Sequence, residues 1–135
     1  MIVLDCSAAV EIVRETEAGK ALQALMLSGE KTVASDLYLI ELASAFRKYV
    51  KAELLSEKEA LLYIEEAAKL VDDLVPLEEN YQESFHESLR LDHSPYDMLY
   101  LTLARRNAAT LFTFDSRLRE ICEKQGVECV HQASL

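Results

Sequence analysis

The clearest strand signal in the sequence is Thr110-Leu111-Phe112-Thr113-Phe114-Asp115. Its apolar and β-branched residues predict a strand, and the polar residues that follow predict a helix from Asp115 to Gln125. The same order opens the chain, where the apolar run Ile2-Val3-Leu4 precedes Asp5 and a helical pattern. Repeated units of a strand followed by a helix favour a parallel sheet with helices on both faces, so we expect an α/β fold.

The other segments continue this alternation. Helical spacing runs from Ser7 to about Leu27, and Gly19 is the expected break because glycine costs roughly 1 kcal/mol relative to alanine inside a helix. Thr32-Val33-Ala34 predicts the second strand. A helix capped by Ser35 or Asp36 is expected from Leu37 to about Ala52, and a second helix from the Ser56–Glu59 capping box to about Asp73. An extended segment over 74–77 and a weaker helix over 79–90 follow. The last expected elements are a helix starting at Ser94-Pro95 and a strand over 127–130.

Length and composition predict one domain over residues 1–135. Half of the residues are hydrophobic, and only 3 Gly and 2 Pro occur, without a linker-like stretch. No apolar run reaches the roughly 18 residues of a membrane helix, and no basic residue precedes Arg14 as in a signal peptide. Cys6, Cys122 and Cys129 lack the spacing of a disulfide framework or a zinc site. We expect a soluble, cytoplasmic protein without membrane association.

The charge balance excludes one mode of nucleic-acid binding. The formal net charge is −10, from 14 Lys and Arg against 24 Asp and Glu, so the surface as a whole repels phosphate backbones. Binding then needs a local device, either a divalent metal held by acids or a cluster of basic side chains. Three basic clusters occur, each of which also fits a solvated helix face: Arg47, Lys48 and Lys51; Arg105 and Arg106; Arg117 and Arg119.

Four acidic residues fall where a parallel sheet of this kind presents its working edge. Asp5 and Asp115 each follow a predicted strand, Asp97 follows the Ser94 cap, and Glu41 interrupts an apolar helical run. Each has an ordinary explanation, since the three aspartates are good helix caps and Glu41 could face solvent. As a set they form an oxygen-rich patch for Mg²⁺ or Mn²⁺, because carboxylates so close together are unfavourable without a cation.

Such a patch predicts hydrolysis of a phosphodiester. A divalent ion activates water and neutralises phosphate charge, so no covalent protein nucleophile is needed. Ser7 and Thr113 each lie two residues from a strand-end aspartate and are candidates either for hydrogen bonds to ligands or substrate, or for packing.

The neighbouring histidines and tyrosines carry weaker signals. His86 and His93 have no partners at metal-ligand spacing, which favours surface or capping roles, although His93 is close enough in sequence to the acids to contact a substrate. Tyr96 and Tyr100 flank Asp97, and this spacing favours core or interface residues over stacking on a base.

Four stretches in order form a pattern over the whole chain: Val3-Leu4-Asp5-Cys6-Ser7-Ala8-Ala9-Val10, Leu39-Ile40-Glu41-Leu42-Ala43-Ser44-Ala45-Phe46-Arg47-Lys48, Ser94-Pro95-Tyr96-Asp97-Met98-Leu99-Tyr100-Leu101-Thr102-Leu103-Ala104 and Leu111-Phe112-Thr113-Phe114-Asp115-Ser116-Arg117-Leu118. With this pattern the chain resembles the PIN-domain ribonucleases, especially the VapC-type toxins of prokaryotic toxin-antitoxin pairs. The acids that fall on the family's four acidic positions, and so become candidate catalytic and metal-binding residues, are Asp5, Glu41, Asp97 and Asp115.

The resemblance implies further properties. These are a five-stranded parallel sheet of order 3-2-1-4-5, divalent-metal-dependent endoribonuclease activity on RNA, a homodimer, and inhibition by a small cognate antitoxin protein. Two positions depart from the family pattern: Cys6 stands where a small Ala, Thr or Ser is common, and Asp36 stands where an apolar residue or Pro is frequent.

Other classes fit less well. A Mg²⁺-binding signalling receiver domain needs a pair of acids after the first strand and a lysine after a late strand, whereas here Asp5 stands alone and no lysine follows Phe114 directly. A phosphatase of the Asp-x-Asp type is disfavoured because Ser7 occupies the second acidic position. A PIN fold that serves only as a non-catalytic binding module stays open, although the presence of all four acids speaks against it.

Overall fold

The computed structural model describes residues 1–26 and 29–130. Within these residues, five parallel strands form one sheet in the order β3-β2-β1-β4-β5. The strands are β1 (Ile2–Leu4), β2 (Thr32–Ser35), β3 (Asp73–Val75), β4 (Thr110–Phe112) and β5 (Cys129–Val130). The expected α/β fold and the strand order implied by the resemblance are both confirmed.

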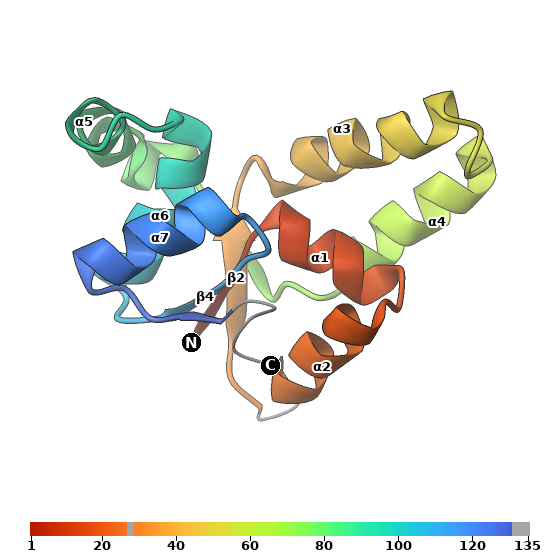
Figure 1. The fold of residues 1–135 in the computed structure, drawn as a ribbon, viewed down its shortest axis with the longest axis horizontal. Helices are drawn as coiled ribbons and strands as arrows, with labels where there is room; N and C mark the ends of the chain where they lie inside the picture. Colours follow the sequence, from red (N-terminus) through yellow and green to blue (C-terminus); the bar gives the residue numbers. More distant parts are fainter. Residues whose placement is uncertain (27–28, 131–135) are drawn as a thin grey trace.

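Helices cover the sheet on both sides. Their bounds are α1 (Cys6–Val13), α2 (Glu17–Met26), α3 (Tyr38–Lys51), α4 (Glu57–Ala68), the 3₁₀ turn η1 (Leu77–Glu79), α5 (Tyr81–Arg90), α6 (Pro95–Arg106) and α7 (Ser116–Gln125). Figure 1 shows α1 to α4 on one side of the sheet and α5 to α7 on the other. No helix in the described part of the chain is long and apolar enough to cross a membrane.

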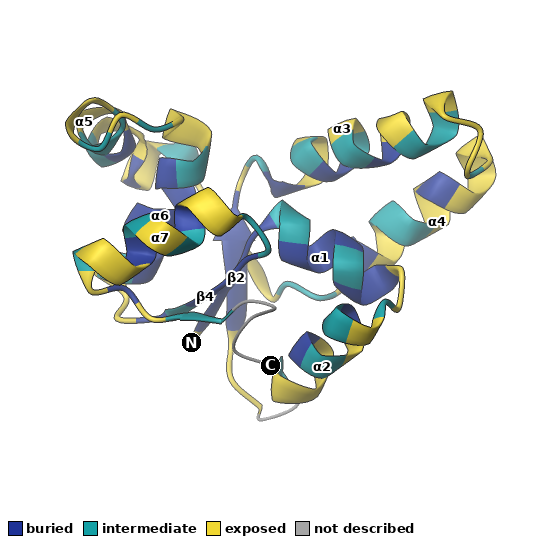
Figure 2. Cartoon of the chain, in the orientation of Figure 1, coloured by how far each residue is buried: buried dark blue, intermediate teal, exposed yellow. Residues whose placement is uncertain are grey.

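The central strand β1 is apolar because it is covered on both faces. All three of its residues are buried, as are most of α1 and the stretch Met98–Ala104 of α6 (Figure 2). β1 pairs in register with β2 and with β4, so that Leu4 lies opposite Phe112. The residues that follow these two strands therefore emerge together at the carboxyl edge of the sheet.

The predicted break at Gly19 is wrong. The chain turns between α1 and α2 at Arg14 to Thr16, where Glu15 has a φ of +56°, and Gly19 is buried inside α2. A Cβ at Gly19 would lie 2.0 Å from the carbonyl oxygen of Glu11 in α1. Close packing of the two helices therefore outweighs the low helix propensity of glycine. The expected helix end near Leu27 lies outside the described residues.

Pairing in the sheet moves two other boundaries. The helix expected to reach Asp73 ends at Ala68, and Asp72 instead exchanges two hydrogen bonds with the backbone of Thr32, one from its amide and one to its carboxylate. β3 consequently occupies 73–75 rather than 74–77. The hydrogen bonds gained by extending the sheet next to β2 replace those of a longer helix.

Helix starts follow the expected chemistry with one exception. Ser56 and Glu59 form the predicted capping box, and the Ser94 hydroxyl caps α6. The cap residue of α3 is Leu37 rather than Ser35 or Asp36, and the Ser35 hydroxyl accepts a hydrogen bond from the Leu37 amide. A side-chain oxygen thus still satisfies a free amide just before the helix.

Candidate active site

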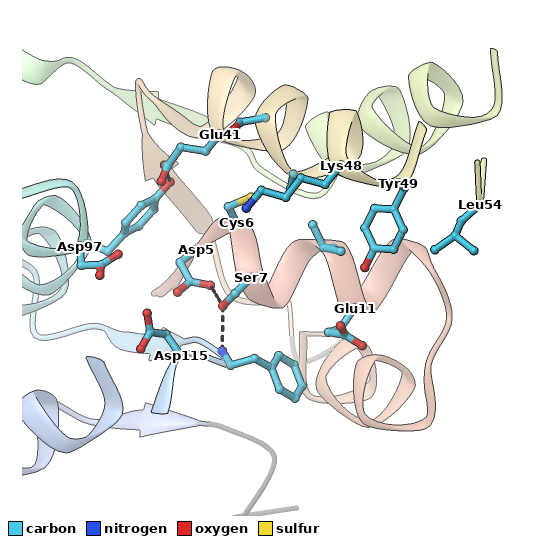
Figure 3. A pocket seen from close by; sticks show the side chains of 15 residues that line it. Asp5, Cys6, Ser7, Glu11, Glu41, Lys48, Tyr49, Leu54, Asp97 and Asp115 are labelled. Atoms are coloured by element: carbon cyan, nitrogen blue, oxygen red, sulfur yellow. Dashed lines mark hydrogen bonds between the residues drawn. The ribbon is translucent and has the colours of Figure 1, made fainter. Parts of the chain in front are cut away.

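A cavity of about 650 Å³ opens at the carboxyl edge of the sheet (Figure 3). All four acids singled out in the sequence line it: Asp5, Glu41, Asp97 and Asp115. They come from the end of β1, the first turn of α3, the first turn of α6 and the segment after β4. The parallel register thus brings together side chains that are separated by up to 110 residues in the sequence.

Asp5 is held rigidly at the floor of this cavity. It is the N-cap of α1, where its Oδ1 accepts hydrogen bonds from the Ala8 amide at 2.9 Å and the Ser7 hydroxyl at 2.7 Å. The Thr113 hydroxyl donates to Oδ2. The residue is only 5% exposed, and burial raises the pKa of Asp5 to about 6 despite these donors.

Ser7 and Thr113 tie Asp5 to the end of β4. The Ser7 hydroxyl accepts from the Phe114 amide at 2.9 Å, and the Thr113 hydroxyl accepts from the Asp115 amide at 3.0 Å. The sequence left open whether Ser7 and Thr113 form hydrogen bonds at the site or only pack. These contacts favour a role in orienting Asp5 over simple packing. The Thr113 hydroxyl thus bonds to both Asp5 and Asp115, and the Ser7 hydroxyl links Asp5 to the adjacent Phe114.

Asp115 is the N-cap of α7 and also lines the cavity. Its Oδ1 accepts hydrogen bonds from the Arg117 and Leu118 amides at 2.9 and 3.1 Å, which makes it the N-cap of α7. Figure 3 shows its carboxylate turned toward Asp5. The interpretation of Asp5 and Asp115 as helix caps is therefore correct, and it is compatible with their facing the cavity.

Glu41 reaches the cavity from α3. Its Oε1 accepts a hydrogen bond of 2.7 Å from the Tyr100 hydroxyl of α6. Burial raises the pKa of Glu41 to about 7, and repulsion by Asp5 and Asp97 adds to this effect. The alternative in which Glu41 faces bulk solvent is wrong.

Asp97 is held by a histidine rather than by a helix cap. The Nε2 atom of His93 lies 2.7 Å from its Oδ2, while the Ser94 hydroxyl accepts from the Tyr96 amide at the helix start. Burial raises the pKa of Asp97, and the charge of Asp115 raises it further, whereas the His93 bond acts in the opposite direction. The electrostatic influence of Asp115 on Asp97 indicates that both belong to one group of acids.

Two site residues were missed by reasoning from the sequence. His93 was assigned a surface or capping role, but its side chain is only 6% exposed. Tyr100 was correctly expected in the core, being 1% exposed, yet its hydroxyl reaches Glu41; Tyr96, by contrast, is 60% exposed. The signal that could have revealed the contact of His93 with Asp97 is the spacing of four residues between His93, just before the predicted helix start at Ser94-Pro95, and Asp97 in the first turn of that helix.

The basic clusters differ in their contacts. Lys48 lines the cavity, whereas Arg105 forms an ion pair of 2.6 Å with Glu83. Arg117 donates to the Asp92 carbonyl at 3.1 Å. Lys48 is thus a cation beside the acids, placed where it can contact an anionic substrate.

Cys6 borders the cavity but is a poor candidate for a soft-metal ligand. Burial, followed by the charges of Glu41 and Asp5, raises the pKa of Cys6 to about 12. A metal-binding cysteine reacts as its thiolate. The thiol therefore remains protonated at neutral pH, and Cys6 packs against the hydrophobic core.

The donor set fits a hard divalent cation. In residues 1–26 and 29–130, no three or more His, Cys, Asp or Glu side chains are arranged so that they could hold a metal ion. Mg²⁺ usually takes only one or two carboxylates and keeps several waters, so a full protein cage is not required. Carboxylates that repel one another in a cavity with room for water provide this oxygen-rich environment.

Five parallel strands in this order, with carboxylates gathered at their carboxyl edge, define a class of small α/β proteins with an acidic site. The PIN domain family model matches residues 2–124, and the chain belongs to this family.

The relatives agree with this assignment. Ribonuclease VapC12 of Mycobacterium tuberculosis is 36% identical over 120 residues, which cover 89% of this chain and 91% of that protein. Two solved structures share the fold. PAE2754 from Pyrobaculum aerophilum has a TM-score of 0.76 at 17% identity and covers 98% of this chain and 91% of its own. The structure of VapBC2 from Rickettsia felis bound to a promoter DNA fragment has a TM-score of 0.69 at 16% identity. The match covers 97% of this chain and 98% of that chain.

Proposed function

We propose that the chain is a divalent-metal-dependent endoribonuclease that hydrolyses RNA, with residues 1–135 acting as one nuclease domain. The observation that carries the proposal is the gathering of four carboxylates around one cavity in a PIN-domain chain. The similarity to Ribonuclease VapC12 supports RNA as the substrate. A non-catalytic binding module would have no need of mutually repelling, partly desolvated carboxylates at one site.

In this proposal Asp5, Glu41, Asp97 and Asp115 are the catalytic and metal-binding residues, and the cofactor is Mg²⁺ or Mn²⁺. When bound, a divalent cation activates water for attack and neutralises charge on the phosphate. The protein contributes orientation: Ser7, Thr113 and the Ala8 amide fix Asp5, while Tyr100 fixes Glu41. Little reorganisation is then needed when the substrate binds.

The rest of the cavity can receive the nucleotide. Tyr49, Leu54 and Phe114 provide an apolar and aromatic wall beside the acids, and bases of single-stranded RNA pack against such surfaces. Lys48 lines the same cavity and provides a local contact for a phosphate. These contacts and the cation offset the repulsion expected from the net charge of −10.

We further propose that the chain is the toxin of a toxin-antitoxin pair and works in the cytoplasm as a homodimer. A small antitoxin would silence it by inserting a basic side chain, most effectively Arg, among the carboxylates in competition with metal. Tyr81, Phe85 and Leu89 form an exposed apolar stripe along α5, which supports an interface with a second subunit.

The test is cleavage of RNA by the purified protein with Mg²⁺, with Mn²⁺ and with excess EDTA. Cleavage should require metal and should be lost in Asp5→Asn. Asp36→Asn is the matched control, because Asp36 is an exposed aspartate that does not line the cavity. Undiminished cleavage in EDTA, or equal cleavage by Asp5→Asn and wild type, would reject the proposal; metal binding without cleavage of RNA would favour the binding module.

A further inference from the structure

His93 lies in the short connection between α5 and α6, four residues before Asp97. Its side chain is 94% buried, and its Nε2 atom is 2.7 Å from Asp97 Oδ2. Asp97 in turn lines the acidic cavity, with 29% of its side chain exposed. The buried imidazole of His93 therefore contacts Asp97, one of the four acids that line the cavity.

A packing role alone does not explain a histidine at this position. The other ring nitrogen, Nδ1, is buried and has no hydrogen-bond partner among the described residues. A buried polar atom without a partner costs about 1–3 kcal/mol, a cost that an apolar ring of similar size would avoid. The bond from Nε2 to Asp97 is thus the interaction that distinguishes histidine from phenylalanine here.

The backbone around His93 is fixed from two sides. The His93 amide donates to the Ser88 carbonyl at 3.1 Å, which ties the connection to the end of α5. Asp92 adopts a φ of +50°, and its carbonyl accepts a hydrogen bond from Arg117 of α7. A non-glycine residue in this left-handed region costs roughly 1–2 kcal/mol, so the connection is held in a conformation that it would not adopt by itself.

We propose that His93 is a positioning residue, which donates its Nε2 hydrogen to Asp97 Oδ2 and leaves Oδ1 of Asp97 free for the cation in the cavity. This inference rests on the proposed metal-dependent function. Acids that bind metals are commonly oriented by such a second hydrogen bond, and loss of that bond typically lowers metal affinity roughly 10–100-fold. His93 itself does not touch the metal or the RNA, because Nε2 is occupied and Nδ1 is buried.

Two substitutions separate positioning from packing. His93→Phe keeps a planar ring but removes the donor, whereas His93→Gln keeps an N–H group at about the place of Nε2. His86→Phe is the matched control, because His86 is an exposed histidine on α5. Thermal melts of all four proteins, in EDTA and in increasing Mn²⁺ at fixed ionic strength, give both the metal-free stability and the apparent Mn²⁺ affinity.

We expect His93→Phe to keep or raise the melting temperature in EDTA and to need roughly 10–100-fold more Mn²⁺ for the same shift. His93→Gln should recover most of the affinity, and His86→Phe should behave as wild type. If wild type itself shows no Mn²⁺ shift, the proposed metal-dependent function fails together with this inference. If the melting temperatures of wild type and His93→Phe rise at the same Mn²⁺ concentrations, only the positioning role of His93 is overturned. Should His93→Phe fail to fold, the comparison is made between His93→Gln and His93→Met, which cannot donate. Equal Mn²⁺ affinities of these two variants would then overturn the positioning role.

Discussion

Tyr100 of α6 donates a hydrogen bond of 2.7 Å to Glu41 of α3, and so joins the two sides of the acidic cavity. The tyrosine ring is buried, which fixes the position of its hydroxyl. Glu41 cannot rotate away from Asp5 and Asp97 without losing this donor. The raised pKa of Glu41 shows that burial and repulsion outweigh the stabilising bond in the absence of a cation.

Tyr100→Phe should impair metal-dependent cleavage with little change in the fold. Loss of one hydrogen bond to a partly buried carboxylate costs about 1–2 kcal/mol of unfolding free energy at pH 8. Cleavage at limiting Mg²⁺ should fall roughly 10-fold, because Glu41 is no longer held toward the cavity. Tyr63→Phe, at a half-buried tyrosine of α4 that does not line this cavity, is the control. Unchanged cleavage by Tyr100→Phe at all metal concentrations would show that Glu41 needs no such support.

Glu41 should make the metal-free protein less stable as the pH rises. The pKa of Glu41 is about 7 in the folded chain against its ordinary value of 4.5, so its contribution to stability is fully present below pH 4.5 and is lost as the pH rises through 7. Converted in full, this pKa shift corresponds to about 3 kcal/mol of unfolding free energy. Because Glu41 is only partly buried, solvent screening reduces the expected loss of stability to about 1 kcal/mol.

Glu41→Gln tests this sign directly. The amide oxygen can still accept from Tyr100 and is uncharged at every pH. Urea unfolding in EDTA should therefore show the variant gaining stability relative to wild type between pH 5 and pH 8. A difference that is independent of pH would mean that Glu41 titrates normally.

The sequence predicted the gathering of the four acids better than it predicted the helix boundaries. Strands this short still carry a clear apolar pattern, and an aspartate directly after a parallel strand must lie at the carboxyl edge. Asp5 and Asp115 were therefore placed by local signals alone. The strand order came from the family resemblance, because short apolar strands do not indicate which neighbour each one takes.

Long-range contacts were beyond such reasoning. Glu41 and Tyr100 are 59 residues apart, and only the packing of α3 near α6 makes them partners. The connection that carries His93 is bonded to another long-range partner, because the Asp92 carbonyl accepts a hydrogen bond from Arg117 of α7. Gly19 was misjudged for the same reason, since its role is set by the backbone of another helix and not by its own helix propensity.

Gly19→Ala should destabilise the protein even though alanine is the better helix former. Propensity alone predicts a gain of roughly 1 kcal/mol. The added Cβ would instead meet the Glu11 carbonyl and force α1 and α2 apart, with an expected net loss of about 2 kcal/mol. Urea unfolding of wild type and variant in EDTA measures this difference. A more stable variant would mean that the two helices separate at little cost.

The last prediction separates metal ligands from helix caps. Asp115 caps α7 through Oδ1, and an asparagine oxygen can accept the same amide hydrogens, so Asp115→Asn should preserve the cap while weakening metal binding. Asp97→Asn likewise removes a charge without removing a helix cap, because Ser94 caps α6. In EDTA both variants should be as stable as wild type or more stable, since repulsion between Asp97 and Asp115 is relieved.

With Mn²⁺ the order of stability should reverse, so that wild type becomes more stable than Asp97→Asn and Asp115→Asn. A ligand that binds only the folded state stabilises it by about 2.7 kcal/mol at a hundred times its dissociation constant, so the melting temperature of wild type should rise with metal. Asp97→Asn and Asp115→Asn should show smaller shifts and no cleavage of RNA, while Asp36→Asn should follow wild type. Equal shifts in all four proteins would remove Asp97 and Asp115 from the metal site and leave them as structural residues at the edge of the sheet.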